Sequence, residues 1–184
     1  MKKGFIGLLI VMISMALLSL AAPKAEADNP VDFNVTVNVL HTLSVEYDSA
    51  DVTAYATLDA NIGGAAVETT SGITITNNGS GVNETYSLNL TNPSGWTASD
   101  TAGTETYVLN AAFDGDGTIS WLAANHALTT SPVASSGTQF AGDDQTGLAV
   151  PYDEERELWF EFTPPTTTTL TGSQSITITI TAAE

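Results

Sequence analysis

Apolar and polar residues alternate along several short stretches of this chain, which is the pattern of β-strands with one buried face. The clearest case covers residues 73–99. It contains a strand with isoleucines at alternate positions, a polar turn rich in Asn and Gly, and a second strand with Tyr86, Leu88 and Leu90 on one face. Residues 93–96, Pro-Ser-Gly-Trp, follow it. This stretch predicts two consecutive strands of a β-sandwich.

Three further stretches alternate as strongly, one near each end of the chain and one before the last. Each has large apolar residues on one face and mostly polar residues on the other. Their apolar positions are Phe33, Val35, Val37 and Val39; Leu158, Phe160 and Phe162; and Ile176, Ile178 and Ile180. We predict a half-buried strand in each of them.

Weaker patterns fill the middle of the chain. Residues 52–58 place small apolar residues at alternate positions and predict another strand, as do residues 107–111, with a continuation at residues 119–121. Residues 123–146 are rich in Ala, Ser, Thr and Gly and contain few large apolar residues. They predict a long surface loop with at most one helical turn.

The fold class follows from about eight or nine short strands with almost no helical periodicity, which predicts an all-β antiparallel sandwich. The motifs T-N-x-G, Y-x-L-x-L and P-x-G-W in residues 76–96 resemble those of secreted bacterial immunoglobulin-like domains. These include modules appended to extracellular glycosidases and choice-of-anchor surface proteins. L-W-F-x-F-T-P-P and G-x-Q-x-I-x-I, within residues 148–181, resemble the last two strands of such modules. The resemblance implies an immunoglobulin-like sandwich and brings no shared catalytic residues.

The first 27 residues have the organisation of a signal peptide: a positive start, an apolar run over residues 5–22 and a small-residue cleavage site, Ala25-x-Ala27. An uncleaved anchor is the alternative, because the apolar run is about long enough to span a bilayer. Pro23 and the cleavage site favour secretion of residues 28–184 as a single domain without a membrane span. The chain contains no cysteine, so a lipoprotein anchor and disulfides are excluded.

The charge balance is strongly acidic, with 21 acidic and 4 basic residues and a net charge of −17. Cleavage after Ala27 would leave Arg156 as the single cation against 20 acidic residues. Nucleic acids and anionic membranes are bound through patches of Lys and Arg, so both are excluded as partners. An acidic surface fits a soluble extracellular coat, with salt tolerance or divalent-cation binding as alternatives.

No motif indicates an enzyme. There is no cysteine nucleophile, His41 and His126 are far apart in sequence, and neither Gly-x-Ser-x-Gly nor His-Glu-x-x-His occurs. A glycosidase needs two carboxylates about 5–10 Å apart, and the spacing of the acidic residues selects no such pair. We therefore expect a protein without catalytic activity.

Calcium is the one cofactor that the sequence suggests. Asp114 and Asp116 lie on a glycine-bearing turn, and calcium prefers oxygen ligands on such turns. Asp143 and Asp144 would complete the site if the long loop folded back onto this turn. An ordinary Asp-Gly turn explains the same residues without a metal, so both interpretations stay open.

Trp159 is the candidate contact residue for a polysaccharide or protein partner. Leu158 and Phe160 are expected to face inward, which places Trp159 on the opposite face together with Glu161. An indole ring on the surface can stack on a sugar. Trp96 and Trp121 are expected in the core instead.

The alternating strands at both ends suggest how such a protein would work. In a monomer they close the edges of the sandwich, whereas in a fibre the strand containing Phe33, Val35, Val37 and Val39 could complete the sheet of a neighbouring subunit. We expect a structural or adhesive cell-surface protein, such as a coat or filament subunit. Its partners would be further copies of itself or other surface proteins. A carbohydrate-binding module is the alternative.

Overall fold

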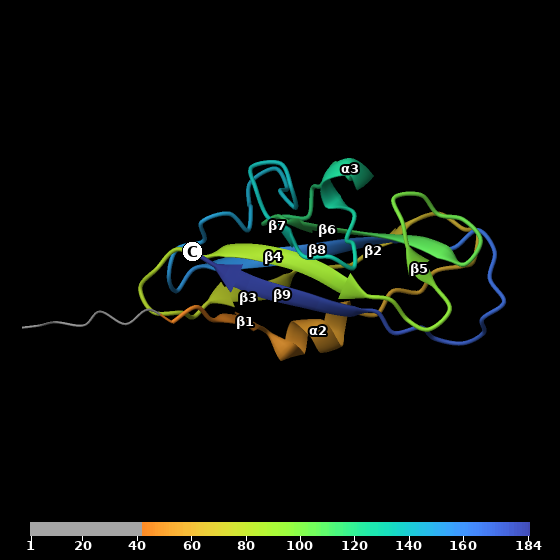
Figure 1. Cartoon of the computed structure of the whole chain (residues 1–184), viewed down its shortest axis with the longest axis horizontal. Coiled ribbons are helices and arrows are strands. Elements are labelled where there is room, and N and C mark those ends of the chain that lie inside the picture. Colours follow the sequence, from red (N-terminus) through yellow and green to blue (C-terminus); the bar gives the residue numbers. More distant parts are fainter. Residues whose placement is uncertain (1–41) are drawn as a thin grey trace, which may run out of the picture. The chain divides into compact units, whose positions relative to one another are not determined.

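The computed structural model describes residues 42–184, which lie in one compact unit. Most of the regular structure in this part of the chain is β-strand, arranged in two sheets (Figure 1). The fold is therefore all-β, as the alternation predicts. The predicted signal peptide, residues 1–27, and the predicted strand at 33–39 lie outside the described residues.

The larger sheet has six strands and is centred on β8 (Glu155–Thr163). Leu158 of β8 lies opposite Ile73 on one side and Phe113 on the other. The ladders are antiparallel, except that β5 and β6 run parallel. The other five strands are β1 (Val45–Tyr47), β2 (Val67–Glu68), β3 (Ile73–Asn77), β5 (Thr97–Ala98) and β6 (Thr106–Phe113).

The smaller sheet consists of β7 (Val133–Ala134), β4 (Thr85–Thr91) and β9 (Thr177–Ala183), in that order. β4 and β9 pair along their full lengths, from Thr85 opposite Ala183 to Thr91 opposite Thr177. Figure 1 shows β9 in dark blue beside the green β4, with β1 and α2 (Ser49–Tyr55) on its other side.

One hydrophobic cluster fills the space between the sheets. The predicted inward faces are confirmed for β4 and β8, whose apolar residues at alternate positions are buried while those between them are less so. β6 differs, because seven of its eight residues are buried. The large members of the cluster are Ile73, Ile75, Tyr86, Leu88, Leu90, Tyr107, Leu109, Phe113, Leu128, Phe140, Leu158, Phe160 and Phe162.

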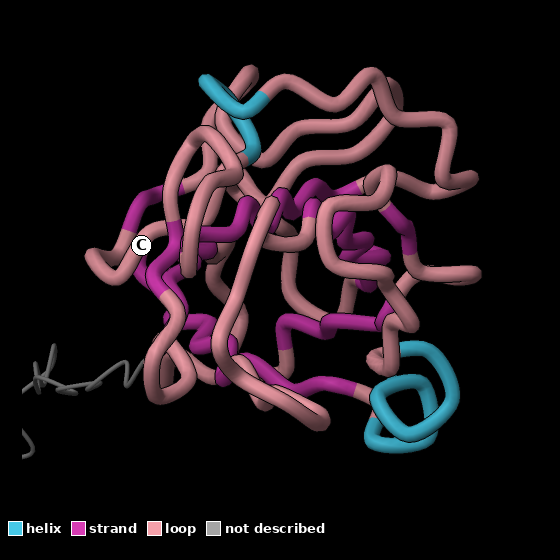
Figure 2. Tube along the Cα trace, turned by 90° about the vertical axis from the view of Figure 1, so that its right-hand side faces the viewer, coloured by secondary structure: helices cyan, strands magenta, loops and turns pink. Residues whose placement is uncertain are grey.

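The predicted strand at residues 52–58 is wrong, because most of it forms the helix α2. Asp48 caps this helix, its side chain accepting a hydrogen bond from the Ala50 backbone N–H at 2.7 Å. Asp51 fastens the helix to β3 by accepting hydrogen bonds from the backbone N–H and the hydroxyl of Thr74. No residue of α2 is fully buried. Figure 2 shows the two helices on opposite sides of the strand layers.

Two expectations for the middle of the chain are wrong in whole or in part. Residues 119–121 form no strand. Residues 123–146 are largely irregular with one helical turn, α3 (Ala123–His126), as expected, but they are not confined to the surface, since they bury Leu128 and Phe140 in the core. The physical reason is hydrogen bonding along the edge of β6, where Leu128 N–H donates to Leu109 and Phe113 N–H donates to Phe140. This segment covers β6, which explains why so much of that strand is buried.

Candidate functional site

An open groove runs along β9 between the two sheets. It consists of two adjoining hollows of about 820 and 500 Å³, both lined by Phe160, Ile176 and Ile178. β9 and the residues before it form one wall, and α2, β1 and the inner face of the larger sheet form the other. The lining is mainly aliphatic and aromatic.

The rim of this groove carries apolar side chains that water can reach. Tyr47, Val52 and Ile62 are 58%, 37% and 45% exposed and all line it. Ile178 and Ile180 of β9 face the core but are only half-buried. Clustered exposed apolar side chains are unfavourable in water and typically mark a surface that another segment covers.

The backbone of β9 is also open on this side. Within residues 42–184, β9 pairs with β4 and with no other strand. An edge strand presents N–H and C=O groups that another strand can pair with. The predicted assembly strand with Phe33, Val35, Val37 and Val39 lies outside the described residues, so its place relative to this edge stays a prediction.

The chain enters the described domain at one end of the groove. Thr42 is tied to Ser80 in the turn between β3 and β4, accepting from the Ser80 N–H at 2.8 Å and donating its own N–H to the hydroxyl at 2.7 Å. Ser44 N–H donates to the buried carboxylate of Glu84 at 2.7 Å. β9 ends at the same turn, where Ala183 lies opposite Thr85. Residue 42 is therefore fixed at the end of the groove where β9 finishes.

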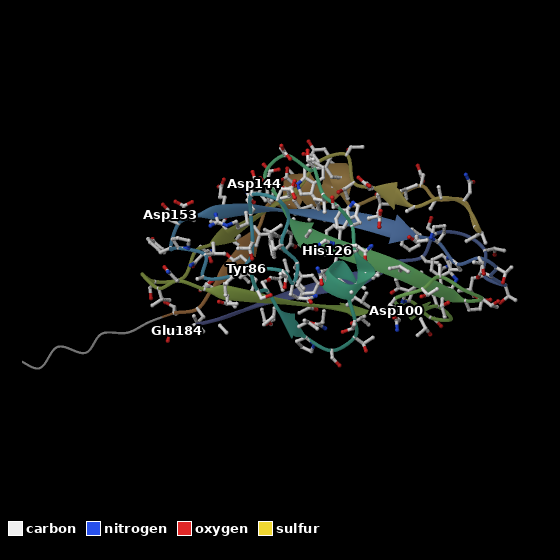
Figure 3. All side chains as sticks on the ribbon, turned by 90° about the horizontal axis from the view of Figure 1, so that it is seen from above. Tyr86, Asp100, His126, Asp144, Asp153 and Glu184 are labelled. Carbon is white, nitrogen blue, oxygen red and sulfur yellow. The ribbon has the colours of Figure 1, made fainter. Side chains whose placement is uncertain are left out.

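Of the four aspartates predicted to bind calcium, the structure brings Asp114 and Asp144 together. The turn after β6 and the loop at residues 141–147 meet where Gly115 N–H donates to the Asp144 carboxylate at 2.7 Å. Asp114 is fully buried, and neither of its carboxylate oxygens has a hydrogen-bond donor among residues 42–184. Burial, and then the neighbouring Asp144 carboxyl, raise the pKa of Asp114 to about 6. Figure 3 shows Asp144 beside β8.

The other two aspartates lie apart from this pair. Asp116 is exposed and accepts a hydrogen bond from Thr118 N–H within its own turn, and Asp143 is exposed as well. Within residues 42–184, no three His, Asp or Glu side chains converge closely enough to hold a metal ion. A cation here would thus bind to two carboxylates, completed by backbone or amide carbonyls and water.

Trp159 lies on the outer face of β8 and is half-buried. Its indole N–H donates to the Asp114 carbonyl at 2.8 Å, and its ring lies so close to Gly117 that a Cβ there would come within 2.6 Å of it. Glu161 accepts a hydrogen bond from the Asn110 amide at 2.7 Å. Trp159 therefore holds the turn after β6, an arrangement that does not favour sugar stacking on this ring.

The remaining tryptophans lie in different surroundings. Trp96 packs against the core and stacks with Phe162 at 6.2 Å between ring centroids. Trp121 is half-buried and meets His126 edge to face at 5.5 Å. His126 and Glu84 are buried polar residues that sequence reasoning missed. No periodicity signals them, because a polar residue at a loop or strand end is normally solvated.

In comparisons with known proteins, no family model, curated protein or solved structure matched this chain. No helix within the described residues has the length and apolar character needed to cross a membrane.

Proposed function

We propose that this protein is a secreted, non-catalytic structural or adhesive component of the cell surface, built on an immunoglobulin-like sandwich of eight or nine strands. Each domain accepts residues 31–39 of a neighbouring copy along β9, so that copies join into a coat or filament. The open groove beside the edge of β9, which pairs with no second strand among residues 42–184, is the observation that carries this proposal.

Residues 33–39 and the groove match in length and chemistry. Residues 33–39 and β9 are both seven residues long, about 23 Å each in extended form. The apolar lining of the groove would be covered by the apolar face of this segment, which consists of Phe33, Val35, Val37 and Val39. Asn34, Thr36 and Asn38 would face outward, as the threonines of β9 do.

Strand direction favours a donor from another copy. Residue 42 is fixed at the end of the groove where β9 finishes, so residues 33–39 of the same chain could lie beside β9 only in the parallel direction. A neighbouring copy is free to add its strand antiparallel. Antiparallel pairing is slightly more stable per residue than parallel pairing, and the N–H and C=O groups at the edge of β9 can pair in either direction.

Introduced cysteines distinguish the two donors, because the natural chain has none. In the protein starting at Asp28, Thr36→Cys is combined with Thr179→Cys on the outward face of β9. We expect a ladder of disulfide-linked multimers on non-reducing gels. The matched control combines Thr36→Cys with Thr138→Cys, an exposed position on the loop at the opposite side, and should give no such ladder.

Light scattering after size-exclusion chromatography tests the same interface without cross-links. We expect the protein starting at Asp28 to form assemblies larger than a monomer, which Val35→Asp or Val37→Asp abolishes. Thr36→Asp adds the same charge to the polar face and should leave the assemblies intact. A monodisperse monomer with a disulfide within one chain would overturn addition between copies.

A further inference from the structure

The buried carboxylate of Asp114 lacks a neutralising partner within the described residues. Its side chain is fully buried, both oxygens are without a donor, and the neighbouring side chain is a second carboxylate, Asp144. An ionised carboxylate without a donor or counter-charge is costly to bury. Something else must therefore offset this charge.

Residues 42–184 contain no spare basic side chain for this purpose. Arg156 is the only Lys or Arg in the described residues. Its guanidinium donates to the backbone carbonyls of Thr146 and Glu155 and lies 3.7 Å from the Glu154 carboxylate. The Asp114–Asp144 pair must hold either a shared proton or a cation from solution.

The backbone around the pair is held in place by several contacts. Gly142 N–H donates to the Phe113 carbonyl at 2.8 Å, and a Cβ at Gly142 would come within 2.6 Å of the Asp114 side chain. From the other side, Trp159 donates to the Asp114 carbonyl. Asp144 is exposed, so an ion from solution can reach its carboxylate beside the buried Asp114.

We propose that Asp114 and Asp144 bind a divalent cation, with calcium as the ion whose ligand preferences fit best. Calcium accepts carboxylate, backbone carbonyl, amide carbonyl and water ligands in flexible numbers, so two carboxylates can anchor a weak site. The Gln145 side chain lies next to this pair, but its Nε2 is the atom near Gly115 and its Oε1 accepts a hydrogen bond from Glu157 N–H at 2.9 Å, so backbone carbonyls and water are the further ligands. Bound calcium fastens the loop at residues 141–147 to the end of β6. This site is independent of the groove along β9.

Terbium luminescence tests the site directly, because Tb³⁺ replaces Ca²⁺ at oxygen-ligand sites and is excited through a nearby indole. Trp159 lies next to Asp114 and can serve as this donor. We expect a saturable signal from the protein starting at Asp28, displaced by calcium. Its apparent dissociation constant for calcium should be about 10⁻⁴–10⁻³ M, the range of weak extracellular sites.

Three variants separate this pair from the general acidity of the surface. Asp114→Asn and Asp144→Asn should each weaken calcium binding roughly tenfold or more, since each removes a charged ligand. Asp143→Asn makes the same charge change on the adjacent exposed residue and should leave affinity unchanged. Asp144 is exposed, so its variant remains informative even if Asp114→Asn fails to fold.

Two results would overturn the proposal. A terbium signal of equal strength and affinity in all three variants would indicate diffuse binding to the acidic surface. Absence of a saturable signal, together with a melting temperature that millimolar calcium leaves unchanged, would show that the pair shares a proton. Neither result bears on strand addition, which the cysteine pairs measure separately.

Discussion

The two sheets meet along two sides of the domain, and these sides differ in whether another part of the chain covers them. On one side, adjacent residues of the 123–150 segment bond to both sheets: Leu128 N–H donates to Leu109 of β6, and Thr129 accepts from Leu90 of β4. Val150 and Glu84 exchange backbone hydrogen bonds farther along. On the other side, β9 and β1 flank a groove lined by apolar side chains. We call these the closed side and the open side.

Two directly paired residues show what this difference does to burial. Leu88 of β4 and Ile180 of β9 lie opposite each other and both face the core. Leu88 is fully buried, whereas Ile180 is only half-buried because it lines the groove. Alternation thus determines which face of a strand points inward. It does not determine whether the edge of that strand is covered.

Truncating these two partners should give unequal losses of stability. Leu88→Ala should lower the free energy of unfolding by about 2–5 kcal/mol, because a fully packed side chain leaves a cavity. Ile180→Ala should cost only about 1 kcal/mol, because less apolar area returns to water. Urea unfolding of the protein starting at Asp28, at a concentration too low for assembly, gives both values.

Equal losses would mean that something covers Ile180 even in dilute solution. Repeating Ile180→Ala together with Val35→Asp then identifies the cover. If residues 33–39 occupy the groove, the cost of Ile180→Ala should fall in that background. If the cost is unchanged, residues 33–39 are not what covers Ile180.

The protein should also lose stability in acid, because the closed side contains the buried His126 (Figure 3). Its Nδ1 accepts from Leu122 N–H at 3.1 Å and its Nε2 lies 3.1 Å from the Ala141 carbonyl, which fixes a neutral ring with the proton on Nε2. Burial lowers the pKa of His126 below its usual value of 6.5. The unfolded chain therefore takes up a proton first, and stability falls as the pH drops below about 6.5.

Unfolding in urea at several pH values between 8 and 5 measures this loss. In His126→Asn the amide oxygen can still accept from Leu122, but the side chain does not titrate. This variant should be less stable at pH 8 and lose less stability on acidification. A pH dependence identical to that of the natural protein would assign the acid sensitivity to other groups.

Much of the fold could be predicted because the strongest strands are half-buried. Alternation located the inward faces of β4 and β8 correctly, since each has one apolar and one polar face. It failed at α2, where the residues at alternate positions are small and the Asp48 cap decides the structure. At residues 123–146 the irregular path with one helical turn was expected, but the burial of a few core residues such as Leu128 and Phe140 was missed.

The sites were predictable only in part. Asp114 was recognisable from its glycine-bearing turn, but its contact with Asp144 depends on a loop whose path is set by hydrogen bonds to Phe113. The groove could not be predicted, because it arises from the absence of a second neighbour beside β9 among the described residues. Sequence patterns specify which residues are apolar, and the topology decides which of them are covered.

The smallest expected effect concerns Glu161, on the outer face of the central strand β8 and away from both sides. Glu161 lies opposite Glu68 on β2, and like charges in such positions are destabilising by roughly 0.2–1 kcal/mol. Burial raises the pKa of Glu161 above its usual value of 4.5, and the negative charge of Glu68 adds to this effect. The hydrogen bond from Asn110 partly opposes it.

A raised carboxyl pKa means that the folded protein takes up this proton at a higher pH than the unfolded chain. The natural protein should thus gain stability from Glu161 as the pH falls from neutrality toward about 4.5. Glu161→Gln should be slightly more stable at pH 7 and lack this gain, while Glu155→Gln, at the exposed start of β8, should change neither. A loss of stability in Glu161→Gln at pH 7 would show that the bond from Asn110 to the charged carboxylate outweighs the repulsion. Assembly along β9 should be the same in both variants, because neither residue lines the groove.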